Sequence, residues 1–362
     1  MPQIFQVVSF LMLVCLPFLS IGQTEARKYS NDFLNIGIGA RSLGMSNAIT
    51  ASVDDVTSGY WNPAGLINIR SNIQVSAMHA EYFAGIANFD YGAVAAKIDD
   101  NSAMGFSLVR LAIDDIPNTL QAMDANGGID YARVTSFSAA DYAFIFSYAR
   151  KITKVEGLSV GGNLKIIYRK VGEFATAYGF GADVGAQYKK GKFIFSAAGR
   201  DITSTFNAWN FTINDADKAT LIKTGNDLPN NSIEITLPAL IIGTAFKTDI
   251  NRSFTFLAEA NLHNTFDKMR NTIINSSVWS ADPSLGVEFG FKNIVFLRGG
   301  VGNIQKVKES RELEKTIARP TIGIGIKFKA IALDYALADV GDASVLRSNI
   351  FSLRIDINRK KS

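Results

Sequence analysis

The sequence predicts an all-β fold, a transmembrane antiparallel β-barrel of about fourteen strands with an N-terminal helical or irregular plug. Segments in which large apolar residues alternate with small or polar ones recur along most of the chain. Mean hydropathy is +0.11, yet no apolar run beyond the N-terminus is long enough for a membrane-spanning helix. Residues 37–66, ahead of the first strand pattern, are rich in Gly, Ala and Ser and too irregular for a strand.

The composition excludes several classes of protein. Apolar residues make up 47% of the 362 residues and charged residues 19%, which excludes a disordered chain. The formal net charge is only +4, and the one dense basic run is the short tail Arg359-Lys360-Lys361. No nucleic-acid partner is therefore expected.

The first 22 residues are predicted to be a secretory signal peptide. Residues 4–21 are almost wholly apolar and end in Ser20-Ile21-Gly22, which supplies small residues at the two cleavage positions. The preceding Met1-Pro2-Gln3 has no Lys or Arg, and a membrane anchor is the alternative. Cys15, the single cysteine, lies within the apolar run, so the mature chain is expected to have no thiol or disulfide chemistry.

Strand patterns follow from residue 72 onward. In 284–292, Leu285, Val287 and Phe289 lie on one face and small or charged residues on the other, which places one set against lipid and one in a polar lumen. A β-sandwich alternates in the same way, but its strands average about 5–6 residues, whereas these approach the ~10 that cross a bilayer at a tilt. The fourteen predicted strands are 72–83, 86–98, 102–113, 137–151, 158–171, 174–190, 192–200, 233–248, 252–262, 284–292, 294–303, 319–328, 331–338 and 347–357.

The links between strands predict an orientation. The four long links, 114–136, 201–232, 263–283 and 304–318, all follow odd-numbered strands and so lie at one end, which in outer-membrane barrels is extracellular. An even strand number places both termini on the periplasmic side. The expected divisions are a signal peptide (1–22), a plug segment (23–70) and an outer-membrane barrel (71–358).

The lumen is predicted to carry charges of both signs in equal number, which favours cross-strand ion pairs in a plugged interior over an ion-selective ring. An ion-selective pore is the alternative. The lumen-facing charged residues are Asp183, Glu259, Glu288, Asp334, Asp356, Lys165, Arg169, Arg298, Lys327 and Arg354.

Residues 33–45, FLNIGIGARSLGM, followed by Asp54-Asp55 and by YWNPAGL at 60–66, resemble the opening of the PorV/PorQ family of Bacteroidetes outer-membrane proteins. That family is similar in turn to the FadL long-chain fatty-acid transporters, whose N-terminal hatch carries an Asn-Pro-Ala motif. The chain has Ile38-Gly39 and Ser46-Asn47 where the best-known PorV opening has Pro-Asp and Gly-Asp, which favours a paralogue. The plug motif is Gly39, Ala40, Arg41, Gly44, Met45, Trp61, Asn62, Pro63 and Ala64.

For each plug-motif residue, the alternative to a functional contact is a purely architectural role in the plug, with no ligand bound. The glycines allow positive φ and close approach to the wall. Met45 and Trp61 are expected to be buried against the inner wall, and Arg41 to pair with a lumen carboxylate.

The resemblance implies a non-enzymatic role in type IX protein secretion. The partners would be secreted proteins with a C-terminal sorting domain or the translocon barrel, besides outer-membrane lipid. Apolar and aromatic residues of the long loops would bind them, namely Phe206, Trp209, Phe211 and Trp279. The alternative is a FadL-like transporter of long-chain fatty acids or other hydrophobic small molecules, with a lateral exit at a kinked strand. Gly161-Gly162 and Gly299-Gly300 are the candidate kinks.

No catalytic, cofactor or metal site is expected. His79 and His263 are the only histidines, and no spacing around them argues for an activated nucleophile or a zinc cluster. Met45 follows Gly44 where a phosphate-binding loop requires Lys. Asp99-Asp100 and Asp114-Asp115 are interpreted as solvated turns, with weak Ca²⁺ binding in the loop as the alternative.

Overall fold

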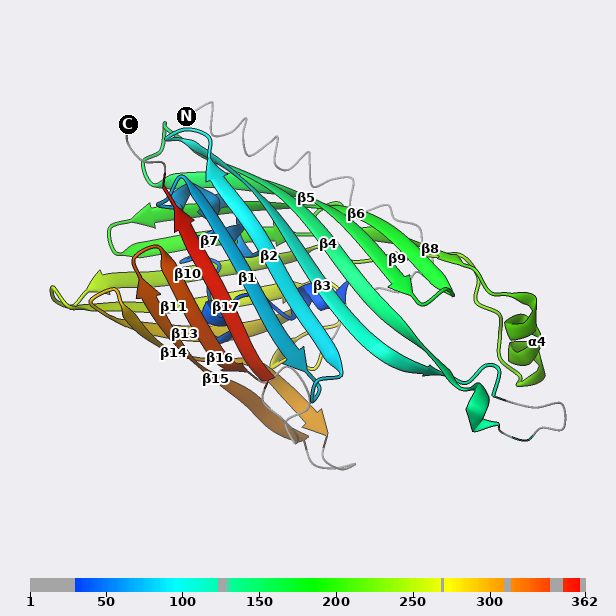
Figure 1. Cartoon of the computed structure of the whole chain (residues 1–362). Helices are drawn as coiled ribbons and strands as arrows, with labels where there is room; N and C mark the ends of the chain where they lie inside the picture. The colour runs from blue at the N-terminus through cyan, green and yellow to red at the C-terminus, as the bar shows by residue number, and fades with distance from the viewer. Residues whose placement is uncertain are drawn as a thin grey trace.

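A closed antiparallel barrel surrounds an N-terminal plug. The computed structural model describes residues 30–122, 128, 130–267, 270–308, 314–338 and 348–358. β1 (Ile73–Tyr82) pairs with both β2 (Ala87–Lys97) and β17 (Ser348–Ile357), which closes the sheet on itself (Figure 1). The predicted fold class, a 14-stranded barrel with helical and irregular N-terminal segments, is confirmed. The predicted signal peptide lies outside the described residues.

The remaining wall strands follow in chain order, each paired with its antiparallel neighbour. They are β3 (Ser102–Asn118), β4 (Thr135–Lys151), β5 (Leu158–Val171), β6 (Ala175–Lys190), β7 (Phe193–Arg200), β8 (Phe206–Phe211), β9 (Ser232–Ile235), β10 (Ala239–Asp249), β11 (Phe254–Thr265), β12 (Ile274–Asn275), β13 (Ser280–Phe291), β14 (Val295–Lys308), β15 (Glu314–Phe328) and β16 (Ile331–Ala338). Every one of the fourteen predicted strands coincides with at least one of these segments.

Two neighbouring wall strands are each interrupted. β7 and β8 both pair with β6, so together they form one wall strand with a break in it. β9 pairs with β8 and β10 pairs with β7, so β9 and β10 form the neighbouring broken strand. The seventeen segments therefore form a fourteen-stranded wall, because the two broken strands contribute two segments each and the two-residue β12 only pairs beside β13. The predicted seventh strand therefore ended too early, and the predicted eighth, 233–248, is not continuous.

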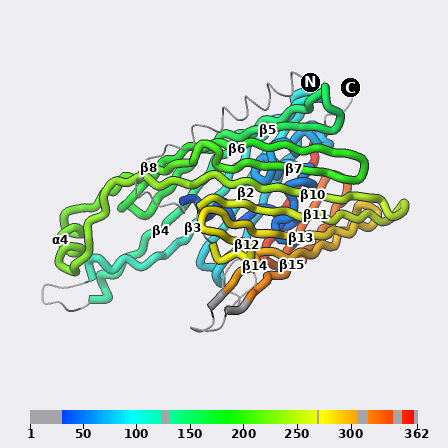
Figure 2. The backbone as a smooth tube through the Cα atoms, turned by 180° about the vertical axis from the view of Figure 1, so that it is seen from behind, coloured from blue at the N-terminus to red at the C-terminus, as the bar shows by residue number. Residues whose placement is uncertain are grey.

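The two ends of the barrel differ. The turn end, where β1 begins and β17 ends, carries the links 98–101, 152–157, 191–192, 250–253, 292–294 and 329–330. At the loop end, the outer parts of β3–β6 with β8, β9 and α4 (Asp215–Lys223) form a projecting lobe (Figures 1 and 2). The predicted loops 114–136 and 201–232 thus contain strand, because β3 continues past a bulge between Ile113 and Ile116 and β8 extends the wall.

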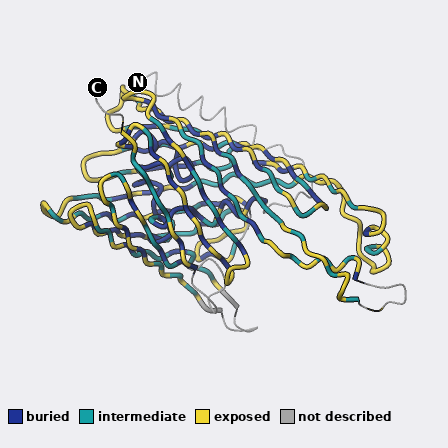
Figure 3. Tube along the Cα trace, in the orientation of Figure 1, coloured by how far each residue is buried: buried dark blue, intermediate teal, exposed yellow. Residues whose placement is uncertain are grey.

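The outer surface carries an apolar belt. Buried and exposed residues alternate along the strands (Figure 3), and outward side chains such as Leu285, Leu297 and Ile322 are more than half exposed. Aromatic pairs border the belt, for example Phe193 with Phe246 near the turn end. Such a belt is typical of outer-membrane barrels, which supports the predicted localisation. None of the helices in the described part of the chain combines the length and apolarity needed to cross a bilayer.

The plug occupies the lumen as a chain of short helices and turns. It contains η2 (Asp32–Asn35), α2 (Ala40–Leu43), α3 (Ser58–Trp61) and η3 (Pro63–Asn68), and a further short helix, η4 (Tyr131–Arg133), lies in the lobe. Met45 and Trp61 are buried, 0% and 4% exposed, as expected. The plug shares one apolar core with the inner faces of β1–β5, including Tyr82, Phe89 and Ile145.

The described ends of the chain lie at opposite ends of the barrel. The Ser30 hydroxyl donates to Glu234 Oε2 at 3.2 Å beside β9, at the loop end. Asn358 accepts a hydrogen bond from the Asn72 backbone N–H at 3.2 Å, at the turn end. The predicted periplasmic placement of the N- and C-terminal ends stays a prediction, because residues 1–29 and 359–362 lie outside the described residues.

Candidate functional site

Inward glycines on the wall seat the plug. A Cβ at Gly300 would lie 2.4 Å from the Met45 carbonyl carbon, and one at Gly161 would lie 2.6 Å from the Ala64 nitrogen. Their outward neighbours, Gly299 and Gly162, have nothing nearer than 3.9 Å and 3.6 Å. The ladders of β5 and β14 run through both glycine pairs without a shift. Neither glycine pair therefore forms a β-bulge, and the inward glycine of each pair admits the plug backbone. That the pairs kink the wall stays a prediction.

Polar wall residues bind the backbone of the plug. The Glu259 carboxylate accepts the N–H groups of Ala51 and Ser52 at 2.7 and 2.9 Å. Gln74 Oε1 accepts the Val56 N–H at 2.6 Å, and Asn163 Nδ2 donates to the Gly59 carbonyl at 2.8 Å. These bonds satisfy buried backbone groups that have no secondary-structure partner, so they fix the plug in one position.

The Asn-Pro-Ala motif is a joint between plug and wall. The Asn62 side chain accepts the Ala64 N–H at 3.2 Å and donates to the carbonyls of Thr50 at 3.2 Å and Ala186 at 3.1 Å. The asparagine thus caps η3, whose first residue is Pro63, and ties it to β6.

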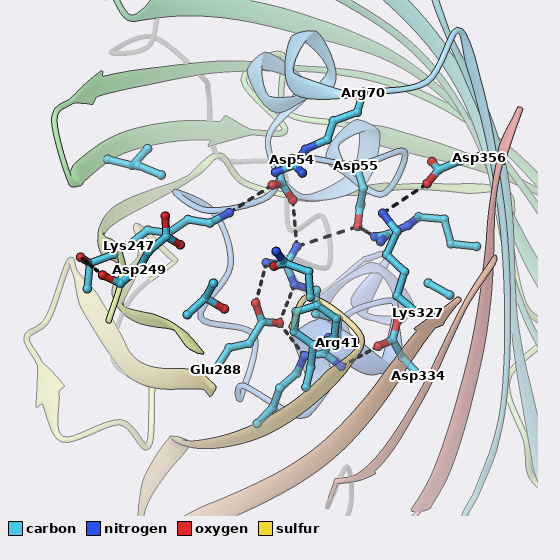
Figure 4. A pocket seen from close by; sticks show the side chains of 18 of the residues that line it. Arg41, Asp54, Asp55, Arg70, Lys247, Asp249, Glu288, Lys327, Asp334 and Asp356 are labelled. Carbon is cyan, nitrogen blue, oxygen red and sulfur yellow. Dashed lines mark hydrogen bonds and ion pairs between the residues drawn. The ribbon is translucent and has the colours of Figure 1, made fainter. Parts of the chain in front are cut away.

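Arg41 is the centre of an ionic cluster on the turn side of the plug (Figure 4). Its guanidinium contacts Glu288 of β13 and Asp54 of the plug, both at 3.0 Å, which is the expected pairing with a lumen carboxylate. Burial alone would lower the pKa of Arg41, but Glu288, Asp54 and Asp55 raise it well above its ordinary value. Burial would raise the pKa of Asp54, but Lys247, Arg41 and Arg354 hold it well below its ordinary value. Plug and wall are therefore joined by groups that stay charged.

The other lumen charges are largely paired across strands, as the balance of signs predicts. Arg298 contacts Glu288 at 2.7 Å and Asp334 at 2.6 Å, and Lys165 contacts Asp183 at 2.7 Å. Lys327 also pairs with Asp356, Arg169 with Asp141 and Glu234, and Lys165 with Asp201, whereas Arg354 pairs with Asp55 of the plug. Glu259 differs, because it binds plug N–H groups. This arrangement is that of a filled interior and not of a selectivity ring.

A polar cavity of about 660 Å³ lies between the plug and the turn end, and we call it the turn-end cavity. The Arg41 cluster forms its inner wall, and Arg70, Lys189, Lys192 and Lys247 are among its lining residues. On the loop side of the plug, two cavities of about 30 and 20 Å³ share Asn35, Arg200, Asp201 and Thr236.

The two small cavities lie at the place where the wall strands are interrupted. Residues 201–205 separate β7 from β8, and residues 236–238 separate β9 from β10 directly alongside, so we call these two segments the wall break. Asp201 and Ser204 adopt left-handed backbone angles, with φ of 52° and 54°. The part-exposed apolar side chains at this level are Ile202, Leu237 and Pro238. Pro238, inside the predicted eighth strand, was the sequence signal for this feature.

The start of the plug covers the wall break from inside. Asn31 Nδ2 donates to Thr236 Oγ1 at 3.0 Å, and the Thr236 hydroxyl donates to the Ser30 carbonyl at 2.7 Å. Arg200 donates to the carbonyls of Leu34 at 3.3 Å and Tyr60 at 2.9 Å. Residues 30–35 therefore form the inner cover of the break.

The loop aromatics that were predicted to bind a partner do not form one patch. Phe206 is 44% exposed on β8. Trp209 lies under the Arg169 guanidinium at 5.0 Å and stacks with Phe211 at 6.0 Å. Trp279 lies beside β11, where its Nε1 donates to Asn264 Oδ1 at 3.2 Å. Their role in binding stays a prediction.

The two histidines lie in different surroundings. His79 is on the outer wall, where its Nδ1 lies 2.7 Å from Asp90 Oδ1, and His263 lines one of the small loop-side cavities. Within the described ranges, no group of three or more His, Cys, Asp or Glu side chains is arranged to hold a metal ion.

Comparison with known proteins establishes the fold and no more. No protein-family model matches the chain. No curated protein matches it either. The Pseudomonas putida toluene transporter TodX is 13% identical, with 89% of this chain and 99% of that chain covered and a TM-score of 0.55. The CymD monoaromatic hydrocarbon channel is 12% identical, with 90% and 99% covered and a TM-score of 0.54.

The Ralstonia pickettii toluene transporter TbuX is similar to the same degree, at 12% identity, with 89% and 99% covered and a TM-score of 0.51. The resemblance of residues 33–66 to the PorV/PorQ family stays a prediction, since these comparisons do not reach it. The chain has the barrel fold of these hydrocarbon transporters.

Proposed function

We propose that this protein is an outer-membrane channel that passes small hydrophobic molecules sideways through the wall break. The observation that carries the proposal is the interruption of two neighbouring wall strands at one level, immediately on the loop side of a tightly held plug. The solved structures of the same fold are described as toluene transporters and a monoaromatic hydrocarbon channel, which supports this class of substrate.

The axial route is unfavourable for such a solute. Glycine contacts and backbone hydrogen bonds hold the plug across the lumen, and the turn-end cavity beyond it is lined by charged side chains. An apolar molecule gains nothing from a charged aqueous cavity, whereas a lateral exit delivers it to the bilayer. Opening of this exit requires residues 30–35 to move away from Thr236 while the rest of the plug stays seated. It also requires the two backbone hydrogen bonds across the wall break to part, from the Ile202 N–H to the Ala182 carbonyl at 2.9 Å and from the Thr236 N–H to the Thr205 carbonyl at 2.7 Å.

Cross-linking residue 31 to residue 236 is expected to abolish uptake of hydrophobic probes. The only cysteine in the sequence is Cys15, so the double variant Asn31→Cys with Thr236→Cys introduces a unique pair across the inner cover. A short bis-methanethiosulfonate reagent would hold the cover closed, and a reductant would release it. Uptake of radiolabelled toluene and oleate by a deletion strain that carries the variant measures the effect, expected as a loss of at least tenfold that reduction restores.

The matched control locks the plug elsewhere. The hydroxyl oxygen of Ser46 in the plug lies 2.9 Å from that of Thr321 on β15, away from the wall break. Cross-linked Ser46→Cys with Thr321→Cys is expected to leave uptake unchanged. Equal loss in both variants would show that the whole plug must move, and uptake no faster than in the deletion strain would remove the transport proposal.

A protein-docking role in type IX secretion is the second candidate, favoured by the resemblance over residues 33–66 and by the projecting lobe. The test is deletion of 212–231, which removes α4 but keeps β8 and β9 in the wall. Under this role, we expect the variant to assemble but to lose co-purification of proteins with a sorting domain. Recovery of the same partners with and without the segment would contradict the docking role.

A further inference from the structure

The turn end of the barrel is strongly basic. Apart from the ion pair of Lys327 with Asp356, the segment before β1, the links and the two strand residues nearest each link contain eleven Lys or Arg and four Asp or Glu. The basic residues are Arg70, Lys97, Arg150, Lys151, Lys154, Lys189, Lys190, Lys192, Arg252, Lys292 and Lys329, and the acidic ones are Asp99, Asp100, Glu156 and Asp249. Among the described residues, none of these eleven cations has an ion-pair partner within 4.0 Å. The rim therefore carries a net positive charge.

Two groups of these cations face different surroundings. Lys292 and Lys329 lie over the rings of Phe291 and Phe328, at 5.4 and 5.3 Å. Those rings are on the exposed outer face, so these two lysines belong to the lipid interface. Arg70, Lys189 and Lys192 line the mouth of the turn-end cavity instead (Figure 4 labels Arg70). Lipid headgroups on the outside of the barrel do not account for the cations at the mouth.

Deeper in the turn-end cavity the charges are already balanced. Arg41, Arg298 and Arg354 each contact a carboxylate, and Lys247 contacts Asp54 at 3.4 Å. A ligand is therefore attracted to the mouth and not into the cluster behind it. The cavity, at about 660 Å³, lies in the range of about 300–1,000 Å³ that holds bound ligands in proteins.

We propose that the mouth of the turn-end cavity docks an acidic peptide segment of a periplasmic protein. Short turns of outer-membrane barrels face the periplasm, which makes this mouth accessible to periplasmic partners. The cations come from the end of β6, the β6–β7 turn and the residues before β1, and of the four acidic residues named above only Asp249 also lines the cavity. A chain with several carboxylates can meet more of these cations than a small anion can. This proposal is independent of the path through the wall break.

The test uses a fluorescein-labelled deca-glutamate peptide and the full mature chain in detergent. Fluorescence anisotropy is expected to show binding that weakens steeply with added salt, because the contacts are exposed charges. Lys189→Glu with Lys192→Glu should weaken binding at least tenfold. The matched control, Lys292→Glu with Lys329→Glu, makes the same change in net charge on the outward side and should weaken it less than twofold.

Three results would overturn the proposal. Equal weakening by the two double variants would mean that the peptide responds only to total charge. Absence of binding at low salt would mean that no docking site exists. A third result concerns lipid: the variant Lys189→Glu with Lys192→Glu could bind less phosphatidylglycerol than the wild type and the same amount of peptide. This result would identify a lipid headgroup as the occupant of the mouth.

Discussion

Replacement of Arg41 by Glu is expected to lower the free energy of unfolding by about 3–5 kcal/mol, the usual cost of breaking a buried ion pair. The new carboxylate would face Glu288, Asp54 and Asp55 in a site where the Arg41 side chain is only 14% exposed, so water and salt screen little of the repulsion. The same change removes the two-pronged contact of Arg41 with Glu288, made at 3.0 and 3.3 Å.

Urea unfolding in detergent micelles measures this effect. Arg41→Lys is the matched control: it keeps the charge but not the planar fork, and a smaller loss is expected. Strand content by circular dichroism should stay the same in both variants, because the barrel ladder does not depend on Arg41. An Arg41→Glu protein that unfolds at the wild-type urea concentration would show that the cluster does not hold the plug.

Gly300→Ala is expected to destabilise the protein by about 1–3 kcal/mol, as overpacking of a filled interior does. The added Cβ would lie 2.4 Å from the Met45 carbonyl carbon and 2.6 Å from the Ser46 nitrogen, and backbone atoms cannot turn aside as a flexible side chain can. Gly161→Ala, against Pro63 and Ala64, should act in the same way.

The neighbouring glycines provide the control. A Cβ at Gly299 meets nothing nearer than 3.9 Å, and alanine in a strand interior is favoured over glycine by about 0.5–1 kcal/mol. Gly299→Ala should therefore be neutral or slightly stabilising in the same urea experiment. A similar loss for Gly299→Ala and Gly300→Ala would contradict the seating of the plug on inward glycines.

The alternation of side chains was sufficient to predict the barrel. Period-2 patterns located the wall strands because outward residues such as Leu285 must meet lipid, while inward ones such as Glu288 must meet polar groups. The pattern does not report which ladder a short strand joins, so the predicted loop 201–232 contains β8. The pattern also does not show a local interruption, so it predicts one strand over 233–248 where the structure has β9 and β10, although Pro238 lies within that range.

The candidate site was only partly predictable. Arg41, Met45 and Trp61 could be assigned to a plug from their motif, and pairing of Arg41 with a carboxylate follows from burying a charge. Its partner Glu288 lies 247 residues away, a distance over which one sequence gives no pairing information. Glu259 looked like one more lumen charge, and its bonds to Ala51 and Ser52 depend on where the plug backbone lies. The wall break requires the pairing of four strand segments, which only the structure supplies.

Single-channel conductance in planar bilayers tests the central claim, that the plug closes the axial path while the exit is lateral. The purified wild-type protein should give no large steady current, because glycine seats, backbone hydrogen bonds and the Arg41 cluster hold residues 30–69 across the lumen. Arg41→Glu should give intermittent openings as the plug loosens. Large steady currents from the wild type would mean that residues 30–69 leave an open axial path, and the account of the plug would be wrong.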